Sequence, residues 1–228
     1  MHSLREVIEQ LDDTFNEVKG LLRVLAPVNL ANGIFAPAWN EFLQSHPGVR
    51  LELQLSNHTQ DLLAGHADLA IRTGEQPDSQ LHQRKLGNIG VKLVASPGYL
   101  QNRSSVSTPA ELRSHEIVVA EPLGLWTFRH RHSNEHFELS PSARLRVNDL
   151  GLALDAACNG MGILMCPLNI CHEALQAGTL VEVMADWRMP TRAIYAVWPQ
   201  QRYLPARVRA LVDYLSGFAV AHPLLQGA

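Results

Sequence analysis

The chain has 228 residues, of which 46% are hydrophobic and 18% are charged, so it is long enough to bury one large core or two small ones. Its formal net charge of −3 at pH 7 argues against direct DNA binding, because proteins that bind DNA usually carry a basic surface. No secretory signal is recognisable, and no apolar run approaches the roughly 18–20 residues that a membrane span needs. The composition predicts a globular cytoplasmic protein that makes no contact with a membrane.

The first predicted element is a helix over residues 2–19, which Gly20 is placed to end. Its apolar residues recur at alternating spacings of four and three, as in a coiled-coil seam: Leu4, Ile8, Leu11, Phe15 and Val18. Two interpretations stay open at this point. The helix packs on its own domain, or it pairs with a second copy of the chain.

Strands and helices then alternate through the first half of the chain. The predicted elements are a strand over 22–26, a helix over 33–45, a strand over 49–55, a helix over 59–65, a strand over 68–71 and a pair of strands over 86–96. Gly65 is suited to end its helix, because glycine tolerates the left-handed conformation found there. Such alternation predicts βαβ units and a mostly parallel sheet.

The pattern restarts after residue 97. The predicted elements are strands over 116–120, 126–128, 136–139 and 145–147, a helix over 150–158, a strand over 162–166, a helix over 168–177 and a strand over 180–184. A strand over 193–198 and a helix opened by Pro205 complete the chain. The two halves share one architecture, which predicts the α/β fold class with two Rossmann-like subdomains.

Two sequence patterns imitate enzyme motifs, and each lacks a required residue. Gly160-Met-Gly162 begins a dinucleotide-binding fingerprint, but it follows a predicted helix and has no third glycine. His172-Glu173 begins a zinc-protease motif, but Gln176 stands in place of the second histidine. Neither a nucleophile elbow nor a phosphate-binding loop occurs in the sequence. The sequence therefore predicts no catalytic residue, no metal and no cofactor.

Two other groups of residues have both a chemical and a structural interpretation. Cys158, Cys166 and Cys171 form an odd set, which we interpret as small buried hydrophobes in preference to redox or metal-binding residues. The segment over 129–136 contains three histidines and two arginines. We interpret it as the solvated tip of a hairpin, in preference to a metal site or an anion-binding patch.

Short motifs along the chain resemble those of one protein family. The run over 61–75 contains the pattern D-L-x-x-G-x-x-D-L-A-I-R-x-G. Further matching words follow in the right order, at 22–27, 41–53, 94–100, 148–149, 160–167, 178–181, 195–199 and 208–215. One such word alone is weak, but together they are specific. Over residues 20–218 the chain resembles the effector-binding domain of LysR-type transcriptional regulators.

The resemblance implies two subdomains joined by two crossover strands, as in type-2 periplasmic binding proteins. The chain would cross between them near Ser96 and near Ala193. The implied domains are a partial linker helix over 1–20, subdomain I over 21–95 and 193–228, and subdomain II over 96–192. The resemblance also implies that the linker helix pairs two subunits. DNA would be bound only by an N-terminal helix-turn-helix domain that is missing from this sequence.

The expected ligand site lies in loops at the carboxyl ends of the strands, where open α/β sheets bind small ligands and where the resemblance implies effector contacts. Helix N-termini and polar side chains in these loops favour a carboxylate or phosphate. The candidate contacts are Val28, Asn29, Leu30, Thr73, Gly74, Ser96 and Pro97, with Leu125, Trp126 and Pro167 as apolar walls. Asn29 departs from the serine or threonine that the family often has there. Each residue could instead serve ordinary turn chemistry.

The sequence thus predicts the effector-sensing and dimerising domain of a LysR-type transcriptional regulator, which is not an enzyme. A small, anionic organic molecule would bind between the subdomains, and the chain would form a homodimer, with a tetramer as an alternative for the full-length protein. A type-2 solute-binding protein of a transporter is an alternative that a signal peptide or lipobox would favour. A small enzyme on the same fold, such as an aromatic-amino-acid dehydratase-like domain, is another, and it would need an acid–base or nucleophile group in the cleft.

Overall fold

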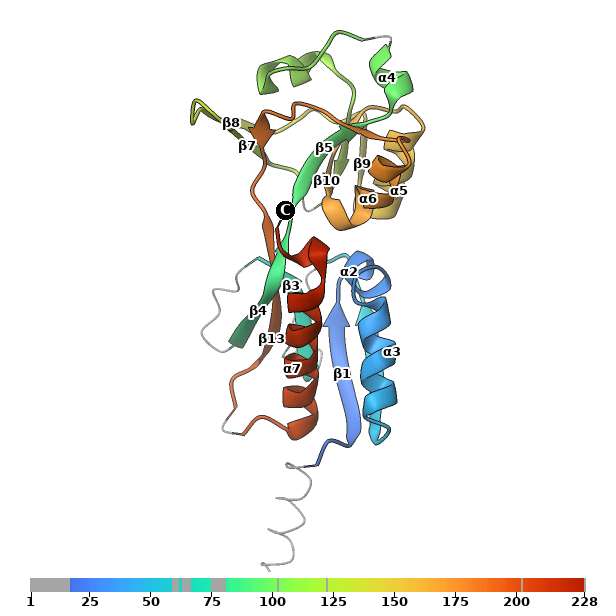
Figure 1. The fold of residues 1–228 in the computed structure, drawn as a ribbon, viewed down its shortest axis with the longest axis vertical. Helices are drawn as coiled ribbons and strands as arrows, with labels where there is room; N and C mark the ends of the chain where they lie inside the picture. The colour runs from blue at the N-terminus through green and yellow to red at the C-terminus, as the bar shows by residue number, and fades with distance from the viewer. Residues whose placement is uncertain are drawn as a thin grey trace, which may run out of the picture. The chain divides into compact units, whose positions relative to one another are not determined.

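The computed structural model describes residues 17–58, 62, 67–74, 81–101, 103–121, 123–201 and 203–227. These residues form two compact units (Figure 1). Unit 1 holds the described residues up to Gly87 together with Ala193–Leu225, and unit 2 holds Asn88–Arg192 with the last described residues. The helices predicted over 2–19 and 59–65 lie outside the described residues, except for 17–19 and Leu62.

A five-stranded sheet in the order β2-β1-β3-β13-β4 forms the centre of unit 1. Its strands are β1 (Gly20–Ala26), β2 (Val49–Leu55), β3 (Leu69–Thr73), β4 (Leu81–Ile89) and β13 (Arg192–Pro199). β1 pairs in parallel with β2 and β3, whereas β13 runs antiparallel to β3. The strands predicted over 22–26, 49–55, 68–71 and 193–198 are confirmed. The predicted parallel pairing is present between β1 and both of its neighbours, whereas β13, which follows the passage from unit 2, runs antiparallel to β3 and makes the sheet mixed.

The helices of unit 1 are α2 (Val28–Asn32), α3 (Ala36–Ser45), α7 (Ala206–Ala221) and the 3-10 helix η2 (Pro223–Leu225). The single helix predicted over 33–45 is therefore two helices, and they separate at Gly33. A Cβ atom on Gly33 would lie 2.7 Å from the carbonyl oxygen of Asn29, so glycine is the residue that fits this tight turn. The apolar side predicted for the last helix is confirmed by the buried residues Val208, Leu211, Val212 and Leu215.

Unit 2 contains a five-stranded sheet in the order β11-β5-β10-β6-β9 and a three-stranded sheet in the order β12-β7-β8. The strands are β5 (Val91–Ala95), β6 (Ile117–Ala120), β7 (Trp126–His130), β8 (His136–Leu139), β9 (Leu145–Val147), β10 (Ile163–Pro167), β11 (Val181–Glu182) and β12 (Trp187–Arg188). The helices are α4 (Pro97–Gln101), α5 (Leu150–Cys158), α6 (Leu168–Gln176) and the 3-10 helix η1 (Pro109–Ser114). Every strand and helix predicted over 116–177 is present.

The main sheet of unit 2 is buried on both faces. On β6, Ile117 belongs to one apolar cluster, whereas Val118 belongs to another that includes Cys166 and Cys171. Both of these cysteines are fully buried free thiols. The hydrogen bond with Cys171, together with burial, raises the pKa of the Cys166 thiol well above its usual value. Cys166 and Cys171 are therefore buried hydrophobes as predicted, while Cys158 is half-buried.

The chain passes between the two units at two places. One passage lies between Arg192 and Ala193, where the sequence prediction placed it. The other lies between Gly87 and Asn88, and not near Ser96 as expected. The difference arises because β5 pairs with β10 and β11 and is therefore part of the unit 2 sheet.

Candidate functional site

The first candidate edge lies in unit 1, where β1 and β3 end. The two strands are parallel, with Leu25 opposite Ala70. Extending this register by three residues brings Val28, the first residue of α2, level with Thr73, the last residue of β3. The loops that follow the two strands therefore meet at the carboxyl edge of the sheet, which is the edge where open α/β sheets bind ligands.

This edge carries both polar groups and exposed backbone. Asn29 in α2 and Thr73 at the end of β3 are half-buried, and Leu30 is buried. Gly74 is exposed and has a φ of 83°, a conformation that favours glycine. Its N–H donates to the carbonyl of Ala193 at 2.8 Å, which fixes the loop after β3 to the start of β13. The structure thus brings the predicted residues of unit 1 to a single edge.

The second candidate edge lies in unit 2, at the carboxyl ends of β6 and β10. These strands are parallel, with Val118 opposite Leu164. Pro167, the last residue of β10, therefore lies at the same edge as the segment after β6, which includes Leu125. Pro167 is buried, whereas Leu125 exposes 58% of its surface. These two predicted residues share an edge.

Ser96 and Pro97 lie at the opposite edge of the unit 2 sheet, which corrects the expectation that they stand at the crossing between the units. β5 runs antiparallel to β10, and Pro167 pairs with Val91 at the start of β5, so the end of β5 is far from the carboxyl end of β10. The Ser96 hydroxyl accepts a hydrogen bond from the N–H of Tyr99 at 3.3 Å. The structure therefore gives Ser96 a local role at the start of α4.

Trp126 was predicted to form an apolar wall of the site, and the structure places it in the core instead. Its side chain is 0% exposed, and its ring packs edge-on against Phe128 with the centroids 6.3 Å apart. The indole N–H donates to the carbonyl of Leu123 at 2.9 Å. With no exposed surface and a satisfied N–H, Trp126 supports the three-stranded sheet and offers nothing to a ligand.

Asn169 is a candidate that the sequence prediction missed. It is the second residue of α6, two positions after Pro167. Both polar atoms of its amide are buried, and neither has a hydrogen-bond partner among the described residues. A buried amide in this state costs free energy unless a ligand or water satisfies it. The signal in the sequence is a polar residue two positions after an apolar strand, and this signal is common to many helix starts.

Tyr99 and His115 form a second polar arrangement that sequence reasoning missed. The Tyr99 hydroxyl accepts from the N–H of Glu116 at 2.9 Å and lies 3.2 Å from His115 Nδ1. Its own proton is therefore available to Nδ1, which favours a neutral imidazole protonated on Nε2. Burial, and secondly the charge of Arg103, lower the pKa of His115. The pair holds α4 against the start of β6 and has the character of a structural contact.

The segment over 129–136 forms the end of β7, a turn and the beginning of β8. Residues 131–136 are exposed, and Asn134 takes a φ of 64° in the turn, so the predicted hairpin tip is confirmed. Within the described part of the chain there is no group of three or more side chains suited to hold a metal ion. None of the helices described there is long and apolar enough to cross a membrane.

Comparison with known proteins gives a consistent result. The pattern that defines the LysR substrate binding domain matches residues 15–219. The HTH-type transcriptional regulator YhjC of Escherichia coli is 33% identical over 217 residues, which are 92% of this chain and 73% of that protein. Full-length AphB, a virulence activator of Vibrio cholerae, has a TM-score of 0.82 at 31% identity, over 94% of this chain and 73% of that chain. The regulatory domain of AphB from Vibrio vulnificus has a TM-score of 0.71 at 28% identity, and the match covers 88% of this chain and 98% of that domain.

The two-subdomain α/β fold predicted from the sequence is confirmed by these structural matches. The chain belongs to the LysR substrate-binding domain family. It is the effector-binding domain of a LysR-type transcriptional regulator. Its relatives are transcriptional regulators and not enzymes or transport proteins, so neither alternative function gains support from them.

Proposed function

We propose that the chain binds a small organic anion through the carboxyl edges of its two five-stranded sheets. The buried amide of Asn169, which has no hydrogen-bond partner among the described residues, is the observation that carries this proposal, since a ligand at this edge of unit 2 would satisfy it. Asn29 and Thr73 offer further polar groups at the equivalent edge of unit 1, and Pro167 and Leu125 offer apolar surface. The prediction that both edges contribute to one site between the units stays a prediction.

The chemistry of these groups favours an anion. The amides of Asn29 and Asn169 and the hydroxyl of Thr73 can all donate hydrogen bonds, and none of the candidate residues is an aspartate or a glutamate. A carboxylate accepts hydrogen bonds and donates none. Uncharged donors together with backbone N–H groups can therefore satisfy it. The absence of a carboxylate among these candidates also removes the charge repulsion that would oppose such a ligand.

Ligand binding would serve regulation and not catalysis. A ligand that binds one arrangement of the domain more tightly than another shifts the population toward that arrangement, and the same free energy couples the ligand site to DNA binding elsewhere in a longer protein. We propose that DNA contacts belong to a helix-turn-helix domain, because the net charge of this chain is −3. The proposed place of action is the cytoplasm.

Substitution of Asn169 with leucine tests the ligand site. Because the apolar side chain removes an amide without a partner, the melting temperature of the free chain is expected to stay unchanged or to rise. Binding of a small carboxylate found in a thermal-shift panel is expected to weaken by about tenfold or more, as loss of a hydrogen bond to a charged group does. Calorimetry measures the affinity, and the thermal melt measures the stability.

Asn159→Leu is the matched control. The amide of Asn159 is already satisfied, because it donates to the carbonyl of Asp155 at 2.9 Å. This variant is therefore expected to lower stability and to leave carboxylate binding unchanged. Equal affinities in wild type and Asn169→Leu would contradict the proposed site, as would a panel in which no small carboxylate binds.

We further propose that the chain forms a homodimer. β2 lies at the edge of the unit 1 sheet, and Leu53 on this strand exposes 36% of its surface. An edge strand with apolar surface is a site that a second copy can cover. The predicted helix over 33–45 does not provide such a surface, because Trp39 and Phe42 of α3 are buried within unit 1. The coiled-coil seam predicted over 2–19 lies outside the described residues, apart from its last residue, Val18.

Light scattering is expected to give twice the mass of one chain, with dissociation on dilution. Leu53→Glu is expected to shift the equilibrium toward the monomer, because it places a charge where an apolar contact is proposed. Val220→Glu is the matched control, since Val220 exposes 78% of its surface on another element of unit 1. A mass of one chain at every concentration would contradict the dimer, and equal effects of the two variants would contradict the proposed surface.

A further inference from the structure

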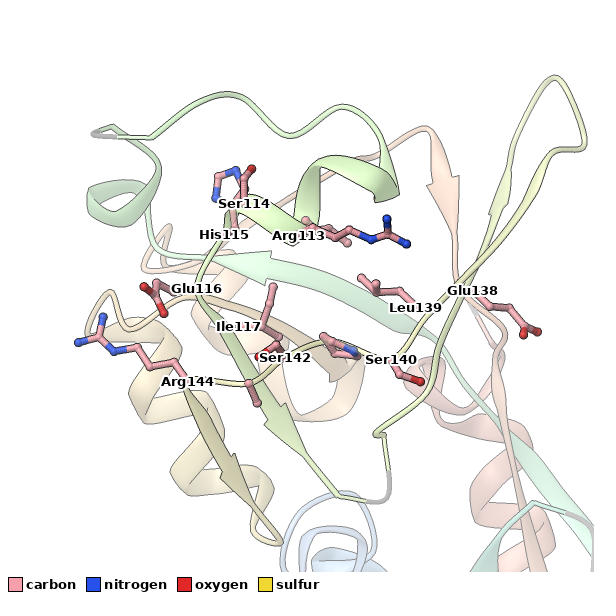
Figure 2. Close-up of a pocket in the computed structure, with 13 residues that line it drawn as sticks. Arg113, Ser114, His115, Glu116, Ile117, Glu138, Leu139, Ser140, Ser142 and Arg144 are labelled. Atoms are coloured by element: carbon pink, nitrogen blue, oxygen red, sulfur yellow. The ribbon is translucent and has the colours of Figure 1, made fainter.

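Unit 2 contains a pocket at the edge of its main sheet opposite to Pro167. The pocket has a volume of about 640 Å³, which lies within the range of small-molecule sites. It is lined by η1, the beginning of β6 and the segment over 138–144 (Figure 2). All of these residues belong to unit 2, so the geometry of the pocket is defined within one compact unit.

The pocket has an apolar floor. Leu112 of η1, Ile117 of β6 and Leu139 of β8 line it, and their exposed fractions are 1%, 2% and 8%. Pro141 is also buried and adds to the apolar lining. An apolar floor of this kind holds the hydrocarbon part of a ligand away from water.

The rim of the pocket is polar and includes two arginines. Arg113 and Arg144 are exposed, and neither forms an ion pair within the part of the chain that the structure describes. Figure 2 shows Arg113 on the side of Leu139 and Arg144 on the other side, next to Glu116. The second carboxylate in the lining, Glu138, lies 4.0 Å from a histidine nitrogen outside the pocket. Arg113 is therefore the cation best placed to meet an anion over the apolar floor.

Other polar groups at the rim are donors or are already engaged. Ser140 and Ser142 are exposed hydroxyls beside the floor, and they can donate to an anion. His115 also lines the pocket, but its Nδ1 is held by the Tyr99 hydroxyl at 3.2 Å. Recognition of charge in this pocket therefore rests on the guanidinium of Arg113, which can bind a carboxylate through two hydrogen bonds.

We propose that this pocket binds a small carboxylate with an apolar body, as a second ligand site separate from the carboxyl edges of the sheets. The carboxylate lies against Arg113 with the hydroxyls of Ser140 and Ser142, and the apolar body lies on Leu112, Ile117 and Leu139. The proposal does not depend on the ligand site proposed around Asn169, because the two lie at opposite edges of the unit 2 sheet.

The test uses hexanoate as the probe on the full 228-residue chain. Hexanamide, with the same body and no charge, and acetate, with the charge and almost no body, are the matched probes. In amide NMR spectra, hexanoate is expected to shift residues 112–117 and 139–144 in a saturable way, and both other probes are expected to bind more weakly. If the shifts did not saturate up to about 10 mM hexanoate, which is about ten times a Kd of 1 mM, the proposal would be overturned. Equal binding of hexanamide and hexanoate would also overturn it.

Three variants test whether hexanoate binds in the pocket itself. Arg113→Gln is expected to raise the Kd of hexanoate by about tenfold or more. Ser142→Phe is expected to fill the pocket and abolish binding without lowering the melting temperature, since Ser142 is exposed. Arg129→Gln removes an exposed charge elsewhere in unit 2 and is expected to change nothing. An equal loss in Arg129→Gln, unchanged binding in Ser142→Phe, or shifts confined to residues around Asn169 and Thr73 would each overturn the proposal.

Discussion

Replacing Trp126 with alanine is expected to lower the free energy of unfolding by about 3–5 kcal/mol, as truncation of a buried aromatic side chain does. The side chain is 0% exposed and its indole N–H donates to the carbonyl of Leu123, so the variant loses packing and a hydrogen bond together. Urea denaturation followed by circular dichroism measures the change. Fluorescence is avoided, because the substitution removes one of four tryptophans.

Leu125→Ala is the matched control, because it changes the adjacent residue and removes a side chain that is 58% exposed. Its effect is expected to stay within about 0.5 kcal/mol, as for most surface substitutions. If Trp126→Ala lowered the free energy of unfolding as little as Leu125→Ala does, Trp126 would lie at the surface. The interpretation of Trp126 as a wall of the ligand site would then stand again.

Most elements of the fold could be predicted because local patterns specify them. Asp149 stands before an apolar run, and its carboxylate does accept the N–H of Leu152 at 2.8 Å as the N-cap of α5. The strands over 49–55 and 145–147 lie where their patterns placed them. The carboxyl edge of unit 1 follows from the same information, since a loop after each parallel strand must lie at that edge.

The direction of a strand within its sheet is not a local property, and this explains the wrong position of Ser96. The pattern over 86–96 predicts two strands, but nothing in it says that β5 runs antiparallel to β10. Burial on short strands raises the same difficulty. Trp126 and Leu125 are neighbours in the sequence, yet the first is enclosed and pairs with Leu139 of β8 while the second is exposed, and the sequence pattern does not show this pairing.

Asn169 could not be selected from the sequence for a related reason. An asparagine is a common residue at a helix start, where its amide usually finds a backbone partner. What distinguishes Asn169 is that its amide is enclosed without a partner among the described residues, a property that depends on the packing around α6. Sequence reasoning therefore identifies the edge of a parallel sheet more readily than an enclosed side chain at that edge.

Thr73→Val is expected to weaken binding of the carboxylate found in the thermal-shift panel several-fold to about a hundredfold, while the fold stays intact. The substitution keeps the shape and removes the hydroxyl. Loss of a hydrogen bond costs about 0.5–1.5 kcal/mol for a neutral partner and about 1.5–3 kcal/mol for a charged one, and each 1.4 kcal/mol is about tenfold in affinity. Thr73→Ser keeps the hydroxyl and is expected to restore most of the affinity in calorimetry.

Arg72 is the competing candidate, because its guanidinium can bind the same anion. Adjacent residues of a strand point to opposite faces. Ala70 packs in a cluster with Leu25 and Leu62, so Arg72 shares the face of that cluster and Thr73 lies on the other. Thr127→Val, a hydroxyl removed from β7 in unit 2, is the matched control and is expected to bind as wild type does. If Arg72→Ala abolishes binding and Thr73→Val leaves it unchanged, the ligand contacts the face of β3 that carries Ala70, and the assignment of Thr73 is wrong.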